Sequence, residues 1–201
     1  MLVGLGLGPG DPELLTLRAV RLLRKADAVF VPGRMAGELV APYRDAEVLE
    51  FPMTQDETVI QECMERNADR IAPVATSGLA VLGILGDPNF FSTFSRLCGV
   101  ISERYPGIDC TTEPGVSAIT AFASAVGIPL SDGFEVTDGG PPGSRILLKV
   151  RKPRDCMKAL INEGFSRFIL VERMYLPEMK VYRDGEMPVE CDYMSVMYAE
   201  R

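Results

Sequence analysis

Apolar runs alternate with amphipathic or polar stretches through residues 1–126 of the chain. The apolar runs predict buried strands, and they span residues 2–7, 28–31, 48–51, 79–85 and 108–111. The stretches between the runs predict helices, and they span residues 12–26, 54–71, 89–105 and 116–126. Strands that alternate with helices are typical of an α/β fold with mainly parallel pairing.

The pattern changes in the last third of the chain. Residues 131–144 include a Gly- and Pro-rich run at 138–143 and predict a loop. Beyond that loop, strands are expected at 145–150, 168–171 and 193–198, a helix at 153–163 and a turn at 181–186. Because the links between these strands are short, we expect antiparallel pairing here.

Composition is that of a globular chain, with 47% hydrophobic and 24% charged residues in 201 positions. No apolar run approaches the roughly 20 residues of a membrane span, so no membrane association is expected. No basic segment precedes the first apolar run, so we expect no secretory leader and a cytoplasmic location. The formal net charge of −7 disfavours nucleic-acid binding. Five scattered cysteines without a C-x-x-C pair indicate reduced thiols.

The chain contains no histidine. This absence excludes Ser-His-Asp and Cys-His catalysis, histidine general bases and histidine metal ligands, and no metal site is expected. Any catalysis must therefore depend on positioning, backbone groups, carboxylates, hydroxyls or cations.

Gly-Asp-Pro occurs twice, at residues 10–12 and 86–88, each time after an apolar run. Asp is a favoured helix N-cap and Pro a favoured first helical residue, so both triplets predict a strand, a turn and a helix start. Residues 113–120 predict a third such junction. Strand ends of this kind expose backbone N–H groups to ligands in α/β proteins. The glycines at 4–10 do not fit G-x-G-x-x-G, and no Gly-Lys-Ser/Thr of a P-loop is present.

Each residue near these junctions has a structural and a functional interpretation. Asp87 is either a helix N-cap or a ligand contact. Phe90 is either a core side chain or part of a cofactor site. The hydroxyls of Ser92 and Thr93 either bond to helix backbone or contact a ligand.

Taken together, these segments resemble the tetrapyrrole methylase family of S-adenosylmethionine-dependent methyltransferases. The matching pieces are residues 3–19, 86–88, 114–118 and 125–130. The resemblance is good over residues 1–131 and looser beyond. Ser92-Thr93-Phe94 after the second Gly-Asp-Pro, and Lys149 after an apolar strand, resemble the branch that methylates C20 of precorrin-2 or its cobalt-bearing counterpart in cobalamin synthesis.

The resemblance implies two α/β domains, residues 1–112 and 113–201, with the cofactor and active site in the cleft between them, in a homodimer. The cofactor would be S-adenosyl-L-methionine, with S-adenosyl-L-homocysteine as product. The residues implied in cofactor binding are Pro9, Gly86, Asp87, Phe90, Ser117, Ala118 and Leu148. Those implied in substrate binding are Asp11, Ser92, Thr93, Arg34 and Lys149. No catalytic residue is assigned, although Asp11 and Glu172 are candidate proton acceptors.

The substrate implied by the resemblance carries several carboxylates, which a chain of net charge −7 repels unless local cations line the site. The available cations are Arg18, Arg34, Arg145, Lys149 and Arg151, and structural ion pairing is the alternative for each. Other functions remain open within the family: another corrin-ring methylase, a siroheme-forming methylase or diphthine synthase. A non-catalytic nucleotide-binding module is the alternative from a different class.

Overall fold

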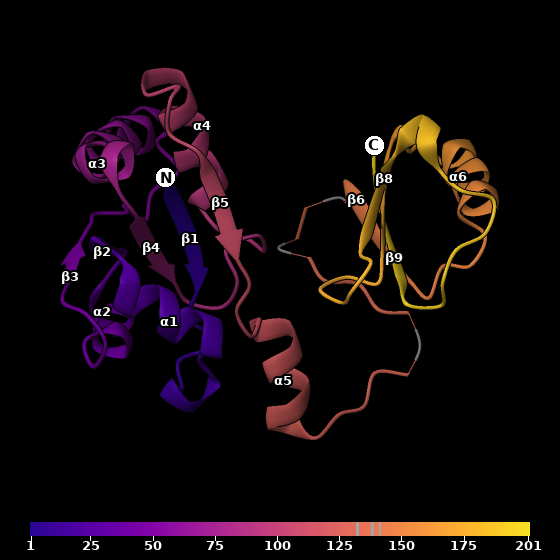
Figure 1. Cartoon of the computed structure of the whole chain (residues 1–201), viewed down its shortest axis with the longest axis horizontal. Coiled ribbons are helices and arrows are strands. Elements are labelled where there is room, and N and C mark those ends of the chain that lie inside the picture. Colours follow the sequence, from indigo (N-terminus) through magenta and orange to yellow (C-terminus); the bar gives the residue numbers. More distant parts are fainter. Residues whose placement is uncertain (132, 138, 141) are drawn as a thin grey trace. The chain divides into compact units, whose positions relative to one another are not determined.

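The chain forms two compact units, residues 1–136 and 137–201, in a computed structural model that describes residues 1–131, 133–137, 139–140 and 142–201 (Figure 1). The sequence placed a domain boundary near Glu113, whereas residues 114–136 group with the first unit. Residues 132, 138 and 141 of the loop expected at 131–144 lie outside the described residues, and its other residues up to 143 form neither helix nor strand.

The first unit is built on a five-stranded sheet in the order β3-β2-β4-β1-β5. Its strands are β1 (Leu2–Gly6), β2 (Ala28–Val31), β3 (Ala46–Val48), β4 (Ala80–Ile84) and β5 (Cys110–Glu113). Every pairing in this sheet is parallel, which confirms the expected α/β class. The strand expected at 48–51 is displaced to Ala46–Val48, where it pairs with the edge of β2.

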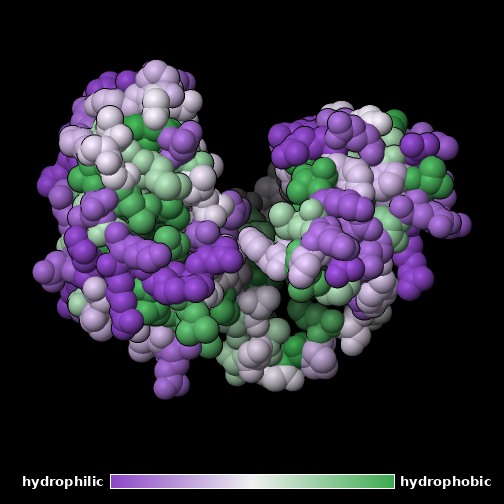
Figure 2. Space-filling view, viewed as in Figure 1, coloured by the Kyte–Doolittle hydropathy of each residue, from purple (hydrophilic) through white to green (hydrophobic). Residues whose placement is uncertain are grey.

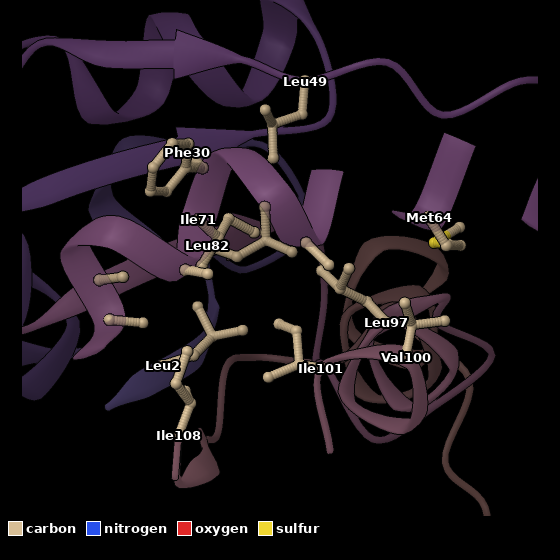
Figure 3. Packing of buried hydrophobic residues seen from close by; sticks show 14 of the residues in the cluster. Leu2, Phe30, Leu49, Met64, Ile71, Leu82, Leu97, Val100, Ile101 and Ile108 are labelled. Carbon is tan, nitrogen blue, oxygen red and sulfur yellow. The ribbon is translucent and has the colours of Figure 1, made fainter. Parts of the chain in front are cut away.

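Helices cover both faces of this sheet. They are α1 (Leu17–Lys25), α2 (Arg34–Val40), α3 (Glu57–Ser77) and α4 (Phe94–Arg104), whereas α5 (Ala118–Val126) follows β5 and has no buried residue among those described. Alternate side chains of β1 enter different layers, with Leu2 in the cluster of α3 and α4, and Val3 and Leu5 in that of α1 and α2. Figure 3 shows the first cluster, in which Leu2 and Leu82 lie with Ile71 of α3. Burial on both faces explains why β1 is apolar throughout.

Two expected helix starts are wrong. Pro12 opens only the 3-10 turn Pro12–Leu14, because Asp11 accepts a hydrogen bond from the Glu13 amide, 2.8 Å away. Helix α1 begins five residues later, where the Thr16 hydroxyl accepts a hydrogen bond from the Ala19 amide. Helix α4 likewise begins at Phe94 rather than at residue 89. The short α2 was not expected, and Gly33 provides no side-chain cap for it.

The second unit is a four-stranded antiparallel sheet in the order β6-β9-β7-β8, as the short links predicted. Its elements are β6 (Ser144–Leu148), α6 (Pro153–Asn162), β7 (Arg167–Glu172), β8 (Lys180–Arg183), a 3-10 turn (Asp184–Glu186) and β9 (Ser195–Glu200). Phe168, Leu170 and Met197 pack on α6 through Leu160. The turn expected at 181–186 is wrong at its start, since Lys180–Arg183 pairs with β7 as an edge strand.

Among the described residues, every helix is too short or too polar to cross a bilayer.

Candidate functional site

Three loops meet at one edge of the parallel sheet. They follow β4, β1 and β5, which are neighbours in the sheet, so the two Gly-Asp-Pro segments and the segment from 114 to 117 leave it at the same edge. The loops after β1 and β4 also bond to each other. The Gly86 amide donates to the Gly8 carbonyl at 2.7 Å, and the Gly8 amide donates to the Gly86 carbonyl at 3.3 Å. Both glycines have φ of +74°, a conformation that glycine adopts without strain.

Backbone atoms of the three loops are in direct contact. A Cβ atom added to Gly115 would lie 2.3 Å from the Gly86 carbonyl oxygen, and one added to Gly6 would lie 2.2 Å from the Gly115 amide nitrogen. Neither position therefore accommodates a side chain. By contrast, nothing lies within 4 Å of the Cβ position at Gly10 or Gly86. The glycine backbone thus borders open space at the same edge.

The Asp87 carboxylate ties the second and third loops together. Its Oδ2 accepts a hydrogen bond from the Gly115 amide at 3.1 Å, and its Oδ1 accepts one from the Asn89 amide at 2.9 Å. Asn89 Nδ2 lies 3.3 Å from Asp87 Oδ1 and 3.2 Å from Thr112 Oγ1, so it bridges to β5. Asp87 is 8% exposed. The N-cap interpretation of Asp87 is wrong, because α4 begins seven residues later; its contact with a cofactor stays a prediction.

The aromatic residues after Asp87 divide into core and surface. Phe94 is buried, and its ring lies 2.7 Å from where a Cβ of Gly4 would be. Phe90 and Phe91 are 43% and 66% exposed, and Phe91 has φ of +50°. The core interpretation is therefore wrong for Phe90. The loop presents apolar surface beside the open glycine backbone.

The hydroxyl residues near the loops mostly serve as caps. Ser92 Oγ accepts a hydrogen bond from the Phe94 amide at 3.2 Å, whereas Thr93, the N-cap residue of α4, makes no side-chain cap. Ser117 is the N-cap of α5 and accepts from the Ile119 amide at 3.3 Å, with Ala118 exposed beside it. Unlike the hydroxyls of Ser92 and Ser117, the Thr93 hydroxyl accepts no hydrogen bond from the first turn of a helix.

The remaining predicted site residues divide between the two units. Pro9 and Asp11 are exposed in the loop after β1, and Arg34 follows β2 at the same edge of the sheet. Leu148 and Lys149 belong to the second unit, at the end of β6. Leu148 is 68% exposed, and Lys149 has φ of +59°.

Several charged candidates already have partners. Arg18 lies 3.0 Å from Glu113, and Arg145 lies 2.8 Å from Glu163, which supports the structural interpretation of both arginines. Arg34 reaches Glu38 only at 3.7 Å.

The candidate proton acceptor of the second unit is also bonded. The Glu172 carboxylate accepts hydrogen bonds from the Tyr182 hydroxyl at 3.2 Å and from the Asp192 amide at 2.7 Å. These bonds hold the carboxylate against its own unit, which weakens the case for Glu172 as a proton acceptor.

Two cysteines in the core of the first unit are unsuited to nucleophilic chemistry. Burial raises the pKa of Cys98 and of Cys110 above that of a free thiol, so both stay protonated at neutral pH. No three or more His, Cys, Asp or Glu side chains of the described residues are grouped so as to hold a metal ion.

Open glycine backbone, exposed aromatic rings and one buried carboxylate lie at the carboxyl ends of parallel strands, which is where α/β proteins bind small molecules. Residues 1–169 match the family model described as Tetrapyrrole (Corrin/Porphyrin) Methylases. The chain belongs to this family of methyltransferases, which confirms the resemblance carried by the loop motifs.

Two similar proteins of this family are named as C(20)-methyltransferases. The probable cobalt-precorrin-2 C(20)-methyltransferase of Methanocaldococcus jannaschii is 34% identical over 198 residues, which cover 89% of this chain and 84% of that protein. The precorrin-2 C(20)-methyltransferase of a Sinorhizobium species is 31% identical over 153 residues, or 67% of this chain and 61% of that protein.

A solved structure supports the fold alone. The putative cobalamin synthesis related protein CobF of Corynebacterium diphtheriae has a TM-score of 0.54 at 13% identity, covering 100% of this chain and 98% of that chain.

Sequence reasoning missed two features of the site. Gly8 pairs with Gly86, and both have a positive φ, but the sequence showed only that the first loop is rich in glycine. Asn89 was not singled out, because its bridge from Asp87 depends on Thr112, in a strand 23 residues away. Nothing in the local pattern signals such a bridge.

Proposed function

We propose that this chain transfers the methyl group of S-adenosylmethionine to C20 of a reduced tetrapyrrole, precorrin-2 or its cobalt-bearing counterpart, in cobalamin biosynthesis. One observation carries the proposal: the archaeal C20-methyltransferase aligns with 89% of this chain at 34% identity. The Ser92-Thr93-Phe94 segment that resembles the C20 branch follows directly on the loop that Asp87 fixes.

The residues at the sheet edge fit this cofactor. Open space beside Gly10 and Gly86 leaves room for a ligand against the backbone, and the exposed ring of Phe90 offers it an apolar contact. The proposed binding set is Pro9, Gly86, Asp87, Phe90, Ser117 and Ala118 in the first unit, and Leu148 in the second. The negative charge of Asp87 favours a cation nearby.

The proposed chemistry needs no histidine. The bound cofactor supplies a methyl group that its positive sulfur has already activated. The protein contributes positioning, which Asp87 supports by fixing the second and third loops to one another. Phe90 and Phe91 have exposed rings that would exclude water from the reacting groups when the ligands are bound. Asp11 in the first loop is the candidate proton acceptor of the first unit, since its side chain is exposed and, among the described residues, only its Oδ1 accepts a bond, from the Glu13 amide.

Substrate contacts are proposed for Asp11, Ser92, Thr93 and Arg34 in the first unit and for Lys149 in the second. Arg34 supports this assignment because its side chain is 89% exposed and its partner Glu38 is 3.7 Å away. A guanidinium held so weakly is available to a carboxylate.

A homodimer is the proposed assembly, with α5 in the interface. None of the described residues of α5 is buried, and the apolar side chains on and after it are 49–62% exposed, namely those of Phe122, Val126, Ile128 and Leu130. Figure 2 shows the α5 surface in green and pale shades with little purple. Exposed apolar patches of this kind mark interaction sites. The cytoplasm is the proposed location, in keeping with five free cysteines.

A labelled-methyl assay tests the function. The protein is incubated with methyl-labelled cofactor and, in separate reactions, with precorrin-2, its cobalt-bearing form, uroporphyrinogen III and the diphthamide-precursor protein. Mass spectrometry is expected to find one added methyl on a precorrin-2 form only. Methylation of uroporphyrinogen III or of the protein substrate instead would replace this proposal with a siroheme-type or diphthine-type function.

A further inference from the structure

Two cations of the second unit share one aromatic ring. Lys149 Nζ lies 5.8 Å from the centroid of the Tyr193 ring, and Arg151 Cζ lies 5.2 Å from the same centroid. Both distances are within the range of cation–π attraction. Tyr193 is 49% exposed, so the two charges gather at the surface rather than in the core.

The backbone around this cluster is held in place from both sides. The Val150 amide donates to the Ser195 carbonyl at 3.3 Å, and the Cys191 amide donates to the Arg151 carbonyl at 3.1 Å. Val150 itself is 4% exposed and belongs to the core. Lys149 and Arg151 thus lie on either side of the buried Val150, and backbone hydrogen bonds join their segment to the segment that carries Tyr193.

Lys149 adopts a conformation that lysine seldom takes. Its φ of +59° is in the left-handed region, which is unfavourable for a residue that carries a side chain. Such strain persists only where the surrounding structure imposes it, and it clusters at binding and catalytic sites. In this chain the strained residue is Lys149, whose charged group lies against the Tyr193 ring.

Among the described residues, no oxygen atom bonds to the charged groups of Lys149 and Arg151, whereas a comparable pair has such partners. Phe165 also carries two cations, but Arg145 bonds to Glu163 and Arg201 donates to the Pro142 carbonyl. Within the part of the chain that the structure describes, no ion pair joins Lys149 or Arg151 to a carboxylate.

The acids nearest in sequence do not neutralise the cluster. Glu190 and Asp192 precede Tyr193, yet neither forms an ion pair with the two cations among the described residues, and Asp192 Oδ1 accepts from the Met194 amide at 2.8 Å. Two like charges on one ring repel each other, and an anion between them removes that repulsion.

We infer that Lys149, Arg151 and Tyr193 form a subsite for one carboxylate side chain of the tetrapyrrole, an inference that rests on the proposed function. Apolar surface adjoins the cluster, since Leu148 and Met194 are 68% and 57% exposed. Cations beside apolar side chains match a ligand with an apolar ring and carboxylates at its periphery. Tyr193 is a positioning residue that holds the two cations together.

Steady-state kinetics on precorrin-2 test the subsite. Arg151→Gln is expected to raise KM about fivefold, as for loss of one exposed charge contact, with kcat and S-adenosylhomocysteine affinity unchanged. Tyr193→Leu is expected to raise KM similarly, and Tyr193→Phe to restore most of the loss, because the ring and not the hydroxyl holds the cations. Lys158→Gln, which removes an exposed charge from α6, is the matched control and leaves KM unchanged.

A binding measurement separates this inference from the proposed function. Fluorescence titration with a porphyrin polycarboxylate is expected to give binding that Arg151→Gln weakens about fivefold and Lys158→Gln does not. Equal binding by wild type, Arg151→Gln and Tyr193→Leu overturns the subsite, even if methylation proceeds. Failure of the wild type to methylate any tetrapyrrole overturns the proposed function, whereas the titration still decides whether the cluster binds carboxylates.

Discussion

At the residue scale, one buried carboxylate organises the candidate site. Asp87 accepts hydrogen bonds from the backbone on both sides of the site, at Asn89 and at Gly115. Bonds from backbone amides to a carboxylate are strong, and each amide left unsatisfied costs about 1–3 kcal/mol. Asp87 therefore has two separable roles, a structural tie and a proposed electrostatic contribution to cofactor binding.

Substituting Asp87 by Asn separates these roles. S-adenosylmethionine carries a positive sulfur and S-adenosylhomocysteine does not, so loss of the negative charge is expected to weaken the first ligand about fivefold more than the second. Calorimetry with both ligands measures the ratio. Asn89→Ala, which disturbs the tie without removing charge, is expected to weaken both equally. If Asp87→Asn weakened the binding of both ligands equally, Asp87 would have only the structural role.

Glycine substitutions at the loops are expected to differ according to what an added methyl group meets. Gly115→Ala forces the loops apart, since its Cβ would lie 2.3 Å from the Gly86 carbonyl, and is expected to cost about 2–3 kcal/mol. In Gly86→Ala the added methyl group contacts no atom, so only the positive φ is unfavourable, and we expect a loss of about 1 kcal/mol in unfolding free energy. Gly107→Ala meets no atom within 4 Å and is the near-neutral control. Urea unfolding measures all three, and a Gly86 effect larger than that of Gly115 would contradict the close approach.

At the element scale, α3 and α4 are joined by a charged network on the outside of their packed core. Asp69 of α3 accepts hydrogen bonds from the Tyr105 hydroxyl at 2.6 Å and from Arg104 at 2.8 Å. The Tyr105 hydrogen bond, with help from Arg104, holds the pKa of Asp69 below its ordinary value. These groups are exposed, so the network contributes modestly to stability.

The lowered pKa of Asp69 predicts an acid-dependent contribution to stability. A carboxyl whose pKa is lower in the folded state stabilises the fold above its unfolded pKa, and the effect is lost as pH falls through the folded value. The difference in unfolding free energy between wild type and Asp69→Asn is therefore expected to shrink from about pH 6 to about pH 3. Urea unfolding over this range measures it. A difference independent of pH would show that the carboxylate charge contributes nothing.

The elements that the sequence predicted well have a strong periodic signal, and those it missed do not. β1, β2 and β4 are apolar throughout because both of their faces are buried, and so they stand out as apolar runs. β8 is polar in sequence and lies at the edge of its sheet, where exposure removes the apolar signal. Helix starts were misplaced because Asp11 and Asp87 bond to nearby backbone in turns that resemble helix caps in sequence.

The candidate site was predictable in its parts but not in its connections. Glycine, Asp-Pro and the order of the three segments located the loops correctly. The Asp87 to Gly115 bond and the shared ring of Tyr193 join residues 28 and more than 40 positions apart, which no local pattern encodes.

At the scale of the whole molecule, the proposed homodimer depends on the exposed surface of α5. α5 presents Phe122, which is 62% exposed, and no residue of that helix is buried among those described. Burying such a surface in a symmetric interface stabilises a dimer.

Light scattering tests the dimer. Wild type is expected to have twice the chain mass, and Phe122→Asp is expected to shift it toward the monomer, because a charge in an apolar interface is costly. Met53→Asp, at a fully exposed position outside α5, is the control and is expected to remain dimeric. A monomeric wild type, or a dimeric Phe122→Asp, would contradict the proposed interface.

The central claim is C20 methylation, and the most direct test is to locate the transferred carbon. The protein is supplied with ¹³C-methyl S-adenosylmethionine and precorrin-2, with and without cobalt, and the product is analysed by carbon NMR. A single labelled methyl at C20 is expected with at least one of the two substrates. A label at any other ring position, or no label with either substrate, would contradict it.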